Sequence, residues 1–201
     1  MTLGATLSRE QADFATSVDR LTSFMGDVTF DTRVDPFLAR NAVYLHGAWT
    51  RVRFSPSGSV NRGRMDARGY LGVFRQAVLV ARVEHDSANR ALPPYLQPML
   101  GGWSNLRGFR AGSFVGDQRA AGSLELRVPL SSALSVARLG VSVFVDAGSS
   151  YDVGEELHEQ PLQRGAGASA WVSATAFRFA LSVARGRGAG TRVNFSLGYG
   201  F

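Results

Sequence analysis

The sequence predicts an all-β fold, an antiparallel transmembrane β-barrel of which about 8–10 strands are present. Three observations predict it. Apolar and polar residues alternate with a period of two along most of the chain. The alternating segments run for roughly nine to twelve residues, which suits a tilted membrane strand better than a soluble one. Short and long connections follow one another, as they do in outer-membrane barrels.

The last segment shows the alternation most clearly. Arg, Asn, Ser and Gly occupy one of its faces, and the other face carries Val193, Phe195, Leu197, Tyr199 and Phe201. Similar alternation predicts strands, in chain order, over residues 23–33, 41–54, 63–74, 76–85, 119–129, 138–148, 165–175, 177–185 and 191–201. In a membrane barrel the apolar face would meet lipid and the polar face would line the lumen.

The segments between the predicted strands differ in length. Residues 186–190 are rich in Gly and are interpreted as a hairpin turn, because a phosphate-binding loop would lead into a helix. Residues 86–118 and 149–164 are long, and a connection of the first length is usually functional or disordered.

The domain organisation is predicted to be simple. Residues 1–22 are an uncertain N-terminal extension, in which residues 10–20 are either a helix or poorly ordered. Residues 23–201 are predicted to be a single barrel domain that includes the long loop.

Composition excludes several classes of protein. The chain has no Cys, so disulfides and Cys-based zinc sites are excluded, and no apolar stretch is long enough for a transmembrane helix. All 22 basic residues are Arg and the net charge is +6, but the Arg residues are spread along the chain, which argues against nucleic acid as a partner. The three His residues are isolated, and no Gly-x-Ser-x-Gly motif occurs. We therefore expect no enzymatic activity, no catalytic residue, no metal and no cofactor.

The long loop contains a distinctive motif. Gly101 and Gly102 are followed by Leu106, Arg107, Gly108 and Phe109. On its own, an Arg-Gly-Phe sequence would indicate no more than a Gly-rich surface loop. Two motifs on the following predicted strands change that interpretation.

The first is Ser123-Leu-Glu-Leu-Arg-Val-Pro129, in which alternation places Glu125 on the polar face. The second is Phe144-Val-Asp-Ala-Gly148, in which Phe144, Asp146 and Gly148 form a Phe-x-Asp-x-Gly pattern with Asp146 on the polar face.

These motifs, in this order, resemble those of the bacterial surface antigen family of outer-membrane protein assembly factors. The resemblance covers residues 24–201. It implies that segment 86–118 folds back into the barrel lumen and that Arg107 pairs there with Asp146 and Glu125. Such a pairing is physically sensible, because a half-buried carboxylate needs a partner and a guanidinium can serve two carboxylates. Gly108 would allow close backbone approach, and Phe109 would be an apolar anchor.

Two further matches lie near the ends of the predicted barrel. The segment from Asp31 to Phe37 resembles the Asp-Thr-Arg-x-x-Pro turn of the family, although the Gly usual there is replaced around residues 41–42. At the other end, Tyr199 and Phe201 resemble the C-terminal aromatic signal by which barrels are recognised for insertion.

The resemblance implies an outer-membrane protein of a Gram-negative-type bacterium. Family members have a sixteen-stranded barrel preceded by POTRA domains, so we expect this chain to be the C-terminal half of such a barrel. No signal peptide is recognisable at its start. The expected partners are outer-membrane lipid, unfolded outer-membrane proteins or exported substrates, and assembly-machinery lipoproteins. Two alternatives stay open: a small self-standing pore or structural barrel, and the barrel domain of a patatin-like lipase.

Overall fold

A computed structural model describes residues 1–13, 18–35, 37–55, 58–130, 137–174 and 177–199. Ten strands form one antiparallel sheet in which each strand pairs with its neighbour in the chain, apart from a small inserted hairpin. In order they are β1 (Thr2–Asp13), β2 (Val18–Asp31), β3 (Ala42–Ser55), β4 (Gly58–Gly72), β5 (Val78–Ala88), β8 (Gln118–Pro129), β9 (Ala137–Tyr151), β10 (Gln163–Ala174), β11 (Phe177–Gly186) and β12 (Thr191–Tyr199).

The remaining elements lie in the two long loops. The loop between β5 and β8 carries the short 3₁₀ helix η1 (Pro94–Leu96) and the two-residue strands β6 (Met99–Leu100) and β7 (Phe114–Val115), which pair with each other. The loop after β9 carries η2 (Leu157–Glu159). Among the described residues, no helix is long and apolar enough to cross a bilayer.

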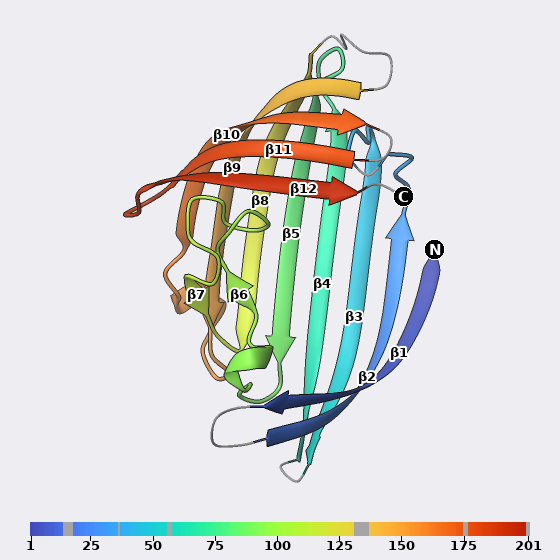
Figure 1. Ribbon diagram of the computed structural model, residues 1–201, viewed down its shortest axis with the longest axis vertical. Coiled ribbons are helices and arrows are strands. Elements are labelled where there is room, and N and C mark those ends of the chain that lie inside the picture. Colours follow the sequence, from blue (N-terminus) through green and yellow to red (C-terminus); the bar gives the residue numbers. More distant parts are fainter. Residues whose placement is uncertain (14–17, 36, 56–57, 131–136, 175–176, 200–201) are drawn as a thin grey trace.

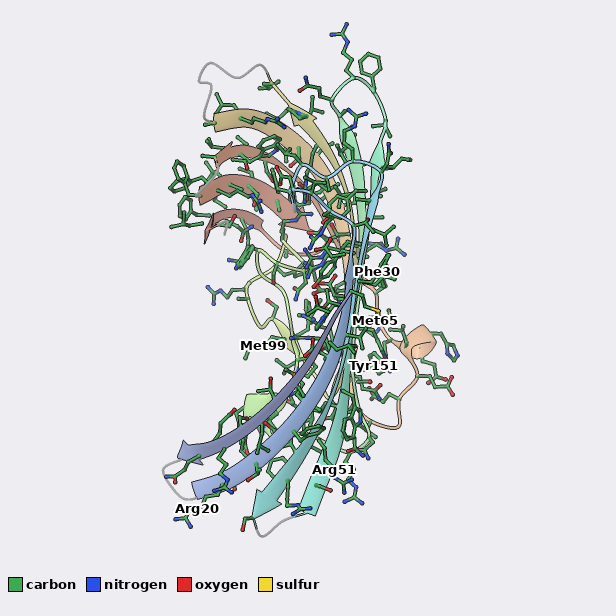
Figure 2. The ribbon with its side chains drawn as sticks, turned by 90° about the vertical axis from the view of Figure 1, so that its right-hand side faces the viewer. Arg20, Phe30, Arg51, Met65, Met99 and Tyr151 are labelled. Carbon is green, nitrogen blue, oxygen red and sulfur yellow. The ribbon has the colours of Figure 1, made fainter. Side chains whose placement is uncertain are left out.

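The sheet is strongly curved. Figure 2 shows that both of its ends bend toward the same side, and that the loop carrying Met99 lies on this concave side. Figure 1 shows β6 and β7 in front of the sheet near β8 and β9. Within the described residues, β1 and β12 are the two edges of the sheet, and they do not pair with each other. The predicted antiparallel all-β fold is therefore confirmed, as is the number of strands, whereas the sheet is not closed.

One expectation for the N-terminal part was wrong. Residues 2–13 and 18–31 form two paired strands, so the described residues of segment 10–20 are neither helical nor an unpaired extension. The alternation of apolar and polar residues is weak in β1, because Leu3 and Leu7 are its only large apolar residues. This strand is stabilised by backbone pairing with β2, from Thr2 opposite Thr29 onward, and that pairing is not visible in local alternation.

The convex face of the sheet is apolar and exposed. Apolar residues face each other across neighbouring strands, so that continuous apolar rows cross β8 to β12. One such row consists of Val128, Val141, Ala170, Leu181 and Phe195. Leu181 and Phe195 are about half exposed or more, at 51% and 62%. An exposed apolar surface of this extent indicates contact with lipid.

Replacing Leu181 with Arg is expected to impair folding into lipid. Leu181 lies near the middle of β11, and a guanidinium on a lipid-facing position of a barrel costs about 2 kcal/mol. The loss of stability can be measured by urea unfolding of the protein in phospholipid vesicles. Leu157→Arg is the matched control, because Leu157 is 44% exposed but lies in η2, outside the sheet. Equal stabilities for both variants would contradict a lipid-facing β11.

Candidate functional site

Arg107 lies at the centre of the contacts between the long loop and the concave face. Its Nη1 donates to Glu125 Oε2 at 2.9 Å, and its Nε and Nη2 donate to the two oxygens of Asp146 at 2.9 and 2.8 Å. Its backbone N–H also donates to Asp146 Oδ2, and Nη2 reaches Ser123 Oγ at 3.1 Å. One guanidinium therefore binds one carboxylate through two parallel hydrogen bonds and a second carboxylate through its remaining nitrogen.

Strand register explains why these acceptors converge. Ser123 of β8 is opposite Asp146 of β9, and Glu125 is opposite Phe144, so all four side chains share the concave face. The guanidinium carbon of Arg107 lies 3.2 Å from the centre of the Phe144 ring. Asp146 and Glu125 are only 3% and 9% exposed, so a carboxylate at either position needs a cationic partner.

At Gly108 the loop lies against the C-terminal end of β11. A Cβ atom on Gly108 would lie 2.4 Å from the backbone nitrogen of Gly186 and 2.6 Å from the carbonyl carbon of Arg185. The ring of Phe109 occupies the space beside Gly186, where a side chain would otherwise project. Gly108 and Gly186 together allow two backbones to pass each other within contact distance.

The loop has a small core of its own. Leu100 and Leu106 are fully buried and pack with Phe109 and with Ala121 of β8. Gly148 faces this core, because a Cβ there would lie 2.8 Å from Leu100.

The two glycines at the start of the loop motif have positive φ angles. The values are +113° at Gly101 and +95° at Gly102, which L-residues rarely adopt. The backbone N–H of Gly101 donates to the side chain of Asn105, which is itself buried. The motif residues from Gly101 to Phe109 are therefore brought together in one compact turn.

A second ionic network binds the loop further along the sheet. Asp66 accepts hydrogen bonds from Arg68 and Arg82, and Asp86 accepts them from Arg64 and Arg119. Two of these Arg side chains also reach the loop backbone, since Arg82 donates to Ser104 O and Arg119 to Met99 O, both at 2.9 Å.

Sequence reasoning missed this network, although its residues lie on the polar faces of the predicted strands. The signal that could have found it is the alternation of Arg with Asp at residues 64–68.

The segment between β2 and β3 also turns onto the concave face. Phe37 is buried, its ring packs edge-on against Trp171, and its carbonyl accepts from Arg127 Nη1 at 2.8 Å. The carboxylate of Asp35 accepts the backbone N–H groups of Phe37 and Leu38. This inward fold was not predicted, because the sequence indicates only a turn there. Residue 36, part of that turn motif, lies outside the described residues, as does Phe201, and the side chain of Tyr199 is not described.

Tyr95 links the loop to the start of β2, outside the spanning part of the strands. Its hydroxyl donates to Asp19 Oδ2 at 2.8 Å. Burial, together with the hydrogen bond to this carboxylate, raises the pKa of Tyr95 to about 12 from the usual 10.0. A raised pKa means that the protonated hydroxyl stabilises the fold fully below pH 10, and that this contribution is lost as the pH rises through about 12.

An alkaline titration is expected to show this directly. Tyrosinate absorbance should contain a step near pH 12 that disappears in Tyr95→Phe. Asp19→Asn removes the negative charge but keeps a similar shape, so it should move that step toward lower pH. An unchanged titration in both variants would mean that Tyr95 does not bind Asp19.

The described residues contain no group of His, Asp or Glu side chains that could hold a metal ion. The contacts of the site consist of ion pairs and hydrogen bonds that hold a loop on a sheet. Its chemistry is that of a structural clamp.

Comparison with known proteins gives the family. A family model described as the Omp85 superfamily domain matches residues 6–201, which covers the sheet from within β1 to the end of β12. A search of curated proteins finds no match. Members of this superfamily are outer-membrane β-barrels of Gram-negative-type bacteria that insert or translocate proteins, and they are not enzymes. The expected likeness to the surface antigen family is confirmed. The chain belongs to the Omp85 superfamily.

Proposed function

We propose that this protein inserts β-barrel proteins into the outer membrane, and that the chain contributes the C-terminal part of a sixteen-stranded barrel. The observation that carries the proposal is the edge strand β12. It pairs with β11 alone among the described strands, although the convex face beside it is apolar and exposed. In lipid, unpaired backbone N–H and C=O groups cost several kcal/mol each, so about half of the backbone groups of β12 require another strand.

Two kinds of strand can meet that requirement. The first strand of the same barrel would close the sheet, and an incoming strand of an unfolded substrate would extend it by β-augmentation. If the first strand of the barrel left β12 and a substrate strand took its place, β12 would serve as the template on which the substrate strand forms, and neither ATP nor a cofactor would be needed. The opposite edge, β1, would pair with preceding strands of the sixteen-stranded barrel.

The loop that Arg107 holds against Glu125 and Asp146 also contacts the edge strand β12. Asn194 of β12 donates from Nδ2 to the carbonyl oxygen of Arg107 at 3.0 Å. Gly108, the next residue, touches the end of β11. The loop therefore joins β8 and β9, through Arg107, to the last hairpin of the sheet. We propose that this connection keeps β11 and β12 in place while the outer edge of β12 exchanges partners.

The proposed partners follow from these surfaces. Outer-membrane lipid covers the convex face, and unfolded outer-membrane proteins pair with the edge of β12. Assembly-machinery lipoproteins would act outside the barrel, and the protein would reside in the outer membrane of a Gram-negative-type bacterium.

A reconstituted folding assay tests the proposal. The protein in liposomes should accelerate the folding of a small urea-denatured outer-membrane barrel relative to empty liposomes. Asn194→Ala should reduce this acceleration because it uncouples the loop from the edge strand, and Ser196→Ala on the same strand is the matched control. Substrate folding at the rate seen in empty liposomes would contradict the proposed function.

A further inference from the structure

Three arginine side chains lie together on the convex face, at the end of the sheet from which the two long loops leave. Arg164 is the second residue of β10, Arg185 is near the end of β11, and Arg187 directly follows β11. The backbone N–H of Arg187 donates to the carbonyl oxygen of Arg164 at 2.8 Å, so these two residues are opposite each other. Arg185 is opposite Ala166, the next outward-facing residue of β10. All three are exposed, and their Cβ atoms are within roughly 8 Å of one another.

These three guanidinium groups have no counterion within the described part of the chain. None of them takes part in an ion pair or donates a hydrogen bond there. The acidic loop between β9 and β10 does not supply a partner, because Glu156 pairs with His158 and Glu155 accepts the backbone N–H of Asp152. Like charges in adjacent positions of a sheet destabilise it. The arrangement therefore indicates an anionic partner that binds from outside the chain.

A groove in the apolar surface leads away from the three arginines along β10. The outward-facing residues of β10 on this path are Ala166, Ala168 and Ala170, and larger side chains stand on both sides, such as Val143 and Val183 opposite Ala168. A hollow of about 990 Å³ adjoins Ala166 and all three arginines, and one of about 370 Å³ continues over Ala168 and Ala170. The groove follows the strand for about 20 Å, which exceeds half the thickness of a bilayer core, about 15 Å.

Arginine on the convex face is confined to this end of the sheet among the described strands. The outward-facing arginines of these strands all lie in the half of their strand next to this end, and they are Arg9, Arg20, Arg51, Arg53, Arg164 and Arg185. Figure 2 shows Arg20 and Arg51 at this end of their strands and Phe30 toward the other end. Outer-membrane barrels carry their long loops on the extracellular side, so the arginines are at the level of the outer leaflet.

We propose that Arg164, Arg185 and Arg187 bind the phosphate groups of an outer-leaflet lipid, and that one acyl chain of this lipid lies in the groove along β10. A planar guanidinium matches two phosphate oxygens at once, and three of them can bind more than one phosphate group. The phosphates would remove the repulsion among the three cations, while the alanines leave room for the chain. The proposal requires that the convex face meets lipid, but it does not depend on the insertion of other proteins.

The test is native mass spectrometry of the protein in detergent micelles that are titrated with diphosphoryl lipid A, and separately with phosphatidylcholine. Lipid A should bind saturably and more tightly than phosphatidylcholine, in which a choline group balances the phosphate charge. Arg164→Gln and Arg187→Gln should each weaken the binding of lipid A on the order of fivefold. Both positions are exposed, so neither change leaves a buried group unpaired. Arg110→Gln is the matched control, because Arg110 is exposed in the inner loop and outside the groove.

The groove is tested separately by filling it. Ala168→Phe should weaken the binding of lipid A, whereas Ala67→Phe, on the same face of β4 but outside the groove, should leave it unchanged. Equal binding by these two variants would overturn the placement of the acyl chain. The headgroup site is overturned if lipid A does not bind saturably, if phosphatidylcholine binds as tightly, or if Arg164→Gln and Arg187→Gln bind lipid A as tightly as Arg110→Gln does.

Discussion

Replacing Arg107 with Ala is expected to release the loop between β5 and β8 from the sheet while the strands stay folded. The change leaves Asp146 and Glu125 buried without their shared cation, and removing one partner of a buried ion pair costs about 4 kcal/mol. Amide hydrogen exchange in residues 99–117 should accelerate by roughly a thousandfold, because the cost falls on loop opening rather than on the whole sheet.

The expected result is specific to this guanidinium. Arg110→Ala is the matched control, since Arg110 lies in the same loop with an exposed side chain. Arg107→Lys keeps the charge but loses the paired hydrogen bonds to Asp146, so it should give an intermediate rate. Equal exchange in Arg107→Ala and Arg110→Ala would contradict the proposed role of Arg107.

Replacing Gly108 with Ala is expected to have the next largest effect. A Cβ at this position would lie 2.4 Å from a backbone nitrogen of β11, so the backbone of the loop or of β11 would have to shift. Overpacking of this kind costs about 3 kcal/mol. The tip of the loop, with Phe109, should lift away from Gly186, which limited proteolysis of the loop would detect.

Gly190→Ala is the control for this second prediction. Gly190 lies in the neighbouring hairpin turn, and a Cβ there would meet no atom within 4 Å. The two substitutions therefore add the same methyl group in a tight and in an open place. Gly108→Ala protein that resists protease as well as the control would show that the loop does not approach β11 this closely.

The strands were predictable because alternation is a local property. In β9, Leu139, Val141, Val143 and Val145 project to the convex face, and Phe144 between them projects to the concave face, as the period-two pattern predicts. Strand ends were less predictable, since β4 begins at Gly58, five residues before the expected start. The hairpin register with β3 sets that boundary, where Phe54 is opposite Gly58.

The site was predictable only in part. Arg107, Asp146 and Glu125 were expected to meet because their motifs resemble those of a family, and the structure places the guanidinium of Arg107 within 2.9 Å of both carboxylates. Alternation gave the face of each carboxylate, but it cannot say which of many Arg side chains approaches it. For the same reason the contacts of Arg82 and Arg119 with the loop backbone were missed. They depend on how the loop is folded, which no local pattern encodes.

The attachment of the loop to the concave face through Arg107 is tested most directly by a double-mutant cycle. Arg107→Ala, Asp146→Ala and the double variant would be compared by the hydrogen exchange of residues 99–117. If the two side chains bind each other, the double variant should be more stable than the sum of the single losses implies, with a coupling free energy of about 2 kcal/mol. Additive losses of stability, with a coupling free energy below about 0.5 kcal/mol, would mean that Arg107 and Asp146 act independently and that this ion pair does not hold the loop on the sheet.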